Sequence, residues 1–125
     1  VHAAFALLWR LRGVGGLDNP MLESEHAVLG EGATLAGTKA KAKREIQELY
    51  GLNVDPEARI FVSLGRLVRQ KGVDLLVDTV PWLLKTYPNA QFILIGPIGD
   101  GFGHYAARKL QLIMEDKSFE GRVFA

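Results

Sequence analysis

The chain has 125 residues, which is the length of about one domain. Hydrophobic residues make up 48% of it and charged residues 23%, a composition typical of folded globular proteins and not of disordered ones. The formal net charge of +1 gives no strong attraction to nucleic acid or to an anionic membrane, and the absence of cysteine excludes disulfides and thiolate metal sites.

Residues 1–55 are predicted to form a connecting segment with one surface helix. The longest early apolar run, residues 3–9, is shorter than the roughly 20 residues of a membrane-spanning helix, so the chain is expected to be soluble, with no transmembrane segment. Apolar residues recur at helical spacing over residues 39–50. Thr38 is expected to cap this helix and Gly51 to end it.

Residues 56–125 alternate more sharply between strand and helix patterns. Two short, mostly apolar runs are predicted to be strands buried on both faces, as in a parallel sheet. Pro81 falls inside a helical pattern that continues beyond it, so we expect a kink and not an end. The expected order is a strand at 60–64, a helix at 73–84, a strand at 91–95, a helix at 105–114 and a strand from Val123. This order predicts a parallel α/β sheet.

The loop after the first predicted strand carries the strongest chemical signal. Gly65 and Gly72 bound it and permit close approach of backbone or ligand. Arg66, Arg69 and Lys71 lie between them, at the positive end of the following helix dipole. Cations beside a helix N-terminus are suited to a phosphate anion, and a guanidinium can contact two phosphate oxygens at once. A solvated basic turn with no ligand is the alternative that the pattern leaves open.

The loop after the second predicted strand, residues 96–103, is rich in glycine but does not have the spacing of a dinucleotide-binding motif. Gly96 is a candidate for backbone contact with a nucleotide or sugar, and a mobile loop is the alternative. Asp100 is expected either to cap the next helix or to contact a ligand. The three histidines are too far apart for a metal site, and the basic run at 39–44 lacks the aromatic residues of an RNA-binding surface.

Several of these motifs resemble those of known enzymes. Gly65-Arg66-Leu67 followed by Gln70-Lys71-Gly72 resembles the motif that opens the nucleotide-binding domain of glycogen and starch synthases. The continuation resembles the synthase domain of fungal α-1,3-glucan synthases, through Pro81, Gly96-Pro97-Ile98, Asp100, Gly103, Ala106-Ala107, Lys109-Leu110 and Gly121-Arg122-Val123. The resemblance extends over residues 39–125 and is looser before them.

The resemblance implies the Rossmann-like half of the C-terminal nucleotide-binding domain of a retaining GT-B glycosyltransferase. In such an enzyme Arg66 and Lys71 would be the catalytic residues, because they would hold the departing diphosphate. Gly65, Gly72 and Gly96 would be the ligand-binding glycines. The implied substrates are a nucleotide sugar, UDP-glucose, and a growing α-glucan acceptor. No cofactor or metal is implied.

The resemblance also implies a larger enzyme on the cytoplasmic side of the plasma membrane, active in cell-wall polysaccharide synthesis. Because the chain begins at Val1 and ends on a nascent strand, we interpret it as a fragment. An N-terminal acceptor domain and the rest of the C-terminal domain would then be missing partners, so the fragment alone is expected to be inactive. The alternatives are a starch or glycogen synthase that uses ADP-glucose, a truncated non-catalytic α/β module and, more remotely, a nucleic-acid-binding module.

Overall fold

The computed structural model describes residues 34–125 of the chain. The predictions that fall on residues 1–33 lie outside these described residues. They are the first part of the predicted connecting segment and the looser motif similarities there.

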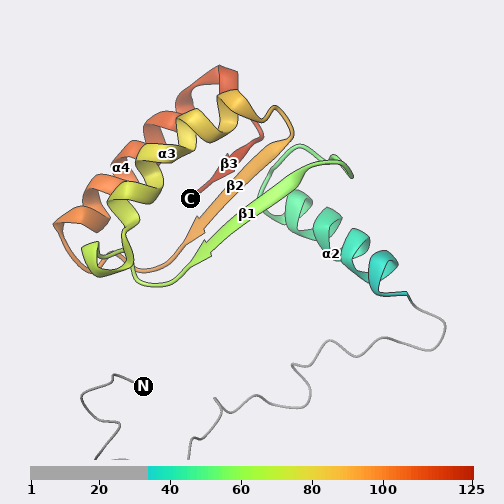
Figure 1. Cartoon of the computed structure of the whole chain (residues 1–125), viewed down its shortest axis with the longest axis horizontal. Helices are drawn as coiled ribbons and strands as arrows, with labels where there is room; N and C mark the ends of the chain where they lie inside the picture. The colour runs from blue at the N-terminus through green and yellow to red at the C-terminus, as the bar shows by residue number, and fades with distance from the viewer. Residues whose placement is uncertain (1–33) are drawn as a thin grey trace, which may run out of the picture. The chain divides into compact units, whose positions relative to one another are not determined.

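The described residues form an α/β structure with a parallel sheet (Figure 1). The elements in chain order are α2 (Leu35–Leu49), β1 (Arg59–Leu64), η3 (Arg69–Lys71), α3 (Val73–Thr86), β2 (Ala90–Ile95), α4 (Gly101–Glu115), η4 (Lys117–Phe119) and β3 (Val123–Phe124). The three strands are ordered β1-β2-β3, and both pairings are parallel. The predicted fold class and order of elements are therefore confirmed, including a helix α3 that continues through Pro81.

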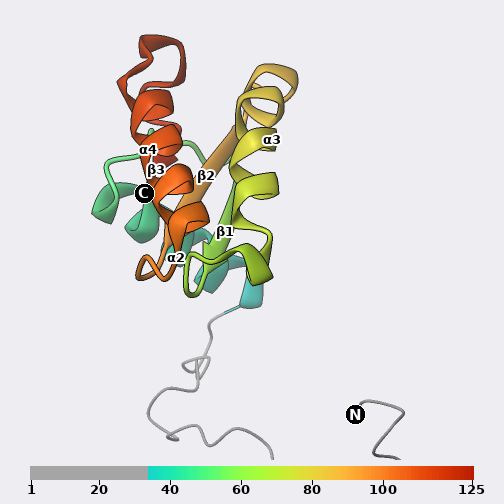
Figure 2. The ribbon, with the colours of Figure 1, turned by 90° about the vertical axis from the view of Figure 1, so that its left-hand side faces the viewer.

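Helices α3 and α4 lie side by side on one face of the sheet (Figures 1 and 2). Alternate residues of β2 point toward them, as the two-residue period of a strand requires. The core between helices and sheet is made of buried apolar side chains, among them Val77, Val80, Leu84, Ala90, Phe92, Leu94, Ala106 and Leu110. This packing fixes the strand ends and the loops that leave them.

The C-terminal half of α2 is attached to the opposite face of β2 by a buried amide pair. Gln47 and Gln91 are 1% and 2% exposed, and the Gln47 Nε2 donates to Gln91 Oε1 at 2.9 Å. Gln47 also bonds both the backbone N–H and the carbonyl of Asp55, and Gln91 donates to the carbonyl of Asn53. Each amide is therefore paired, which removes the penalty for burying it.

The start of α2 differs from the prediction. The helix begins at Leu35 and Thr34 is its N-cap, since the Thr34 hydroxyl accepts from the Gly37 N–H. Thr38 lies inside the first turn, where its own hydroxyl donates to the Thr34 carbonyl, so its prediction as the cap was wrong. The end agrees with the prediction, because Gly51 follows the helix with a left-handed φ of +64°.

Strand β1 was predicted to be buried on both faces, and in the described part of the chain it is not. It pairs with β2 along one edge, and Phe61, Val62 and Leu64 are 44%, 52% and 72% exposed. Only β2, the central strand, is buried along nearly its whole length. The apolar run of β1 indicated a strand correctly, but it could not show which neighbours would cover it.

Arg122 joins the end of α3 to the start of β2. Its Nη2 donates to the carbonyls of Leu84 and Tyr87 at 2.8 and 2.7 Å, and its Nε donates to the carbonyl of Ala90 at 3.1 Å. Burial lowers the pKa of this guanidinium from its ordinary value. One side chain thus satisfies carbonyls that the helix end leaves without an intrahelical partner.

We expect Arg122→Met to lower the free energy of unfolding by about 2 kcal/mol, because three carbonyls lose a charged donor. Urea unfolding of the variant measures this. Arg108→Met is the matched control: Arg108 is exposed and bonds only Gln111, three residues along the same helix, so its effect should stay within about 0.5 kcal/mol. Equal effects of the two substitutions would refute the role given to Arg122.

Candidate functional site

The loop between β1 and α3 is shaped by its two glycines. Gly65 has a φ of +146° and Gly72 a φ of +65°, both in the range that residues with a side chain rarely adopt. Gly72 is also the N-cap of α3 and has no side chain to bond the N–H groups of the first turn. The caps of α2 and α4, in contrast, are made by the side chains of Thr34 and Asp100. The first-turn N–H groups of α3 therefore point toward the loop without a side-chain acceptor.

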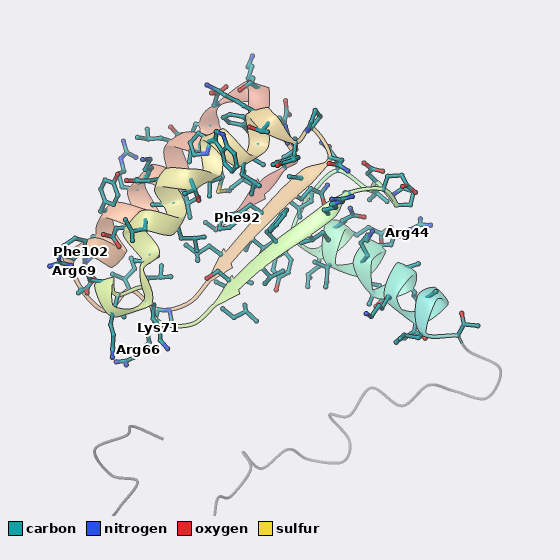
Figure 3. All side chains as sticks on the ribbon, viewed as in Figure 1. Arg44, Arg66, Arg69, Lys71, Phe92 and Phe102 are labelled. Carbon is teal, nitrogen blue, oxygen red and sulfur yellow. The ribbon has the colours of Figure 1, made fainter. Side chains whose placement is uncertain are left out.

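Arg66 and Lys71 line the same small pocket at the carboxyl end of β1 (Figure 3). The pocket has a volume of about 190 Å³, and its other lining residues are Ser63, Leu64, Gly65, Leu67, Val73, Leu76 and Leu94. Both basic side chains are exposed, and neither forms a salt bridge within the described residues. Two cations over an apolar base, next to a helix N-terminus, form a site suited to an anion.

Arg69, the third cation of this loop, lies apart from the other two. Its guanidinium carbon is 4.9 Å from the centre of the Phe102 ring, at the start of α4, which is a cation–π contact. Figure 3 shows Arg69 beside Phe102, whereas Arg66 and Lys71 lie at the end of β1. The structure therefore brings two of the three predicted cations together and assigns the third to a contact between loops.

The loop after β2 packs closely against the loop after β1. The Leu67 N–H donates to the Pro97 carbonyl at 2.8 Å, and the Gly99 N–H donates to the Leu67 carbonyl at 3.0 Å. Gly96 lies directly against Gly65, and a Cβ at Gly96 would overlap the Gly65 carbonyl oxygen. The closeness of these backbones explains why glycine is present there.

Gly96 lines a second cavity, not the one that holds Arg66 and Lys71. This cavity, of about 450 Å³, is lined mainly by apolar residues and shares Leu67 and Leu94 with the smaller pocket. The predicted contact of Gly96 with a ligand remains a prediction, as do those of Gly65 and Gly72.

Asp100 is the N-cap of α4, as one of its two predicted roles required: its Oδ1 accepts from the Gly103 N–H at 2.9 Å. Its second oxygen makes a contact that the sequence did not indicate. Oδ2 accepts from the backbone N–H of Arg69 at 2.9 Å, across 31 residues of sequence. A single carboxylate therefore connects the two loops at the edge of the site.

Comparison with known proteins shows which enzymes have a segment similar to this chain. The chain is 35% identical over 131 aligned residues to the cell wall α-1,3-glucan synthase mok11 of Schizosaccharomyces pombe, covering 98% of the chain and 5% of that protein. It is 36% identical over 99 residues to a glycogen synthase of Cellvibrio japonicus, covering 76% of the chain. It is 30% identical over 126 residues to granule-bound starch synthase 1 of Zea mays, covering 94% of the chain. The chain is therefore homologous to a segment of glycosyltransferases of the glycogen and starch synthase type.

The chain spans a small part of these relatives: 5% of the length of the α-1,3-glucan synthase, 19% of the glycogen synthase and 20% of the starch synthase. No protein-family model matches it. Among the helices of residues 34–125, none is both long and apolar enough to cross a lipid bilayer.

The Asp100 carboxylate has a pKa below its ordinary value. The main cause is the hydrogen bond from the Arg69 N–H, followed by that from the Gly103 N–H, with smaller contributions from the Phe102 N–H and the charge of His104. Because the pKa is lower in the folded state, the ionised carboxylate stabilises the fold above its unfolded pKa of about 3.9. This contribution is lost as the pH falls through the lower, folded value.

We therefore expect the stability difference between the native chain and Asp100→Asn to depend on pH. The native chain should be the more stable at neutral pH, and the difference should close as the pH falls below about 4. Urea unfolding at a series of pH values between 3 and 7 measures it. A difference that stays constant over that range would show that the ionised carboxylate contributes nothing.

Proposed function

We propose that the chain is the diphosphate-binding part of a retaining glucosyltransferase that uses a nucleoside-diphospho-glucose, with UDP-glucose as the donor. The observation that carries this proposal is the convergence of Arg66 and Lys71 on one pocket, beside the N-terminus of α3 that no side chain caps. The carboxyl end of a parallel strand is also where open α/β sheets bind their ligands. The relatives with matching segments are an α-1,3-glucan synthase, a glycogen synthase and a starch synthase.

The two cations would act on the leaving group. In glucosyl transfer the bond between the anomeric carbon of glucose and the β-phosphate oxygen breaks, and its electron pair remains on the diphosphate. The glucosyl group joins the oxygen of an acceptor hydroxyl, and the proton of that hydroxyl passes to the departing diphosphate. Negative charge on the diphosphate is greater in the transition state than in the bound donor, so fixed cations lower the barrier to the chemical step. Arg66 and Lys71 would supply this charge without a metal ion.

The size of the pocket fits this limited role. At about 190 Å³ it is smaller than the roughly 300–1,000 Å³ of pockets that enclose a drug-sized ligand. It can take the diphosphate but not the whole nucleotide sugar. Groups for the base, the glucose and the acceptor would come from other parts of a longer enzyme, including an acceptor domain. By analogy with the α-1,3-glucan synthases, we propose an α-glucan as acceptor and a location on the cytoplasmic side of the plasma membrane.

Isothermal titration of the chain with UDP, UDP-glucose, ADP-glucose and uridine tests this proposal. We expect both UDP and UDP-glucose to bind and uridine, which has no phosphate, to give no measurable heat. Tighter binding of ADP-glucose than of UDP-glucose would favour the glycogen and starch synthase alternative. Equal, negligible heats for all four compounds would contradict a diphosphate site and favour a non-catalytic α/β module.

A further inference from the structure

Asp100 holds a position between the two loops that its role as a helix cap does not explain. Capping α4 requires one acceptor oxygen, which Oδ1 provides to the Gly103 N–H. The second oxygen, Oδ2, accepts from the Arg69 N–H. Within residues 34–125, no other side chain from outside the loop of Gly65–Gly72 forms a hydrogen bond with that loop.

In the sequence of the loop, Arg69 falls between Arg66 and Lys71, the two cations of the proposed site. On the Arg66 side, the loop is fixed by the backbone bonds of Leu67. On the Lys71 side, it is a 3₁₀ turn, Arg69–Lys71, followed by the left-handed Gly72. The Arg69 N–H, at the first residue of that turn, donates to the Asp100 Oδ2. This bond fixes the backbone at the point from which the chain turns toward Lys71.

We propose that Asp100 is a positioning residue for the diphosphate: by holding the Arg69 N–H, it sets the place of the Lys71 ammonium relative to the Arg66 guanidinium before a ligand binds. This inference rests on the proposed function. A loop that is already ordered loses less conformational entropy on binding, so its affinity for the ligand is higher. When the contacts that support a binding site are lost, its charged groups remain but no longer have the geometry that the ligand requires.

The negative charge of Asp100 allows the positioning role to be distinguished from a purely electrostatic effect on anion affinity. A carboxylate close to a diphosphate repels it, so removal of this negative charge should strengthen anion binding if electrostatics alone mattered. If Asp100 instead acts by position, its removal should weaken binding. The two effects predict opposite changes in affinity.

Asp100→Asn removes the hydrogen bond to the Arg69 N–H and keeps the N-cap of α4. Asparagine is as good an N-cap as aspartate, so its amide oxygen can still accept from Gly103. Its NH₂ group then faces the Arg69 N–H and cannot accept from it. Asp116→Asn is the matched control, because Asp116 is an exposed N-cap of η4 that bonds Ser118 and involves neither loop.

Two readouts test the proposal on the native chain and the two variants: the dissociation constant for UDP, and the hydrogen-exchange rate of the Arg69 amide without ligand. For Asp100→Asn we expect UDP affinity to fall about tenfold and Arg69 exchange to accelerate by a similar factor. Asp116→Asn should leave both unchanged. Unchanged or tighter UDP binding by Asp100→Asn, or fast Arg69 exchange in the native chain, would overturn the positioning role.

A further variant, Lys71→Ala, distinguishes a failure of the proposed diphosphate site from a failure of the positioning role of Asp100. If Lys71→Ala weakens UDP binding and Asp100→Asn does not, the proposed function stands and the positioning role fails. If the native chain binds no UDP, the proposed function fails and the positioning role fails with it. In that case the exchange rate of the Arg69 amide still shows whether Asp100 orders the loop.

Discussion

Replacing Gly96 by alanine is expected to lower the free energy of unfolding by about 3 kcal/mol, at the upper end of the range for overpacking. The backbone at Gly96 is not in the left-handed region, so alanine is compatible with its conformation. Its Cβ, however, would overlap the carbonyl oxygen of Gly65 and lie 2.6 Å from the carbonyl carbon. Because the obstacle is backbone and not a flexible side chain, the loops have to separate to admit it.

Gly101→Ala is the matched control for this prediction. Gly101 is the first residue of α4, and a Cβ there meets nothing within 4 Å. Alanine should therefore leave stability unchanged or raise it by up to about 1 kcal/mol, through its higher helix propensity. Urea unfolding of both variants measures the contrast. A Gly96→Ala chain as stable as the native one would show that the two loops do not pack as closely as described.

Replacing Lys71 by alanine is expected to weaken UDP binding about tenfold, and replacing Arg66 and Lys71 together about a hundredfold. Each would remove a charged hydrogen bond to a phosphate, which contributes about 1.5–3 kcal/mol. Both side chains are exposed, so the fold should not change. Isothermal titration measures the affinities, and the thermal midpoint of each variant verifies that it is folded.

Arg69→Ala is the control for charge alone. It removes the same unit of charge from the same loop, but the Arg69 guanidinium contacts Phe102 and does not line the pocket. At physiological salt, where screening acts over about 8 Å, we expect its effect on UDP affinity to stay below about threefold. An equal loss of affinity for Arg69→Ala and Lys71→Ala would mean that the loop attracts the nucleotide only by its overall charge.

The order of strands and helices could be predicted because it depends on local patterns. The apolar runs around Phe61 and Phe92 and the helical spacing from Val73 onward each indicated an element that the structure contains. The exposure of β1 could not be predicted, because it depends on which strands lie beside it and not on its own residues. The cap of α2 was misassigned since Thr34 and Thr38 are both suitable residues, and local sequence alone does not choose between them.

The candidate site was predictable to a similar extent. Charge and spacing indicated the three cations Arg66, Arg69 and Lys71. The resemblance to glycogen and starch synthases singled out Arg66 and Lys71, and the structure places these two in one pocket. The separate position of Arg69 depends on Phe102, and the second contact of Asp100 depends on Arg69, so both require the two loops to be brought together by the sheet. A glycine-rich loop that carries an aspartate two residues before an aromatic residue gives no local sign of this pairing.

The most direct test of the central claim is a crystal structure of the chain soaked with UDP-glucose. We expect the diphosphate at the carboxyl end of β1, with its oxygens about 2.7–3.2 Å from the Lys71 Nζ and the Arg66 guanidinium. The loop from Gly65 to Gly72 should be in the same conformation as without ligand. A nucleotide bound elsewhere, with Arg66 and Lys71 both free of phosphate, would contradict the assignment of this loop as the diphosphate site.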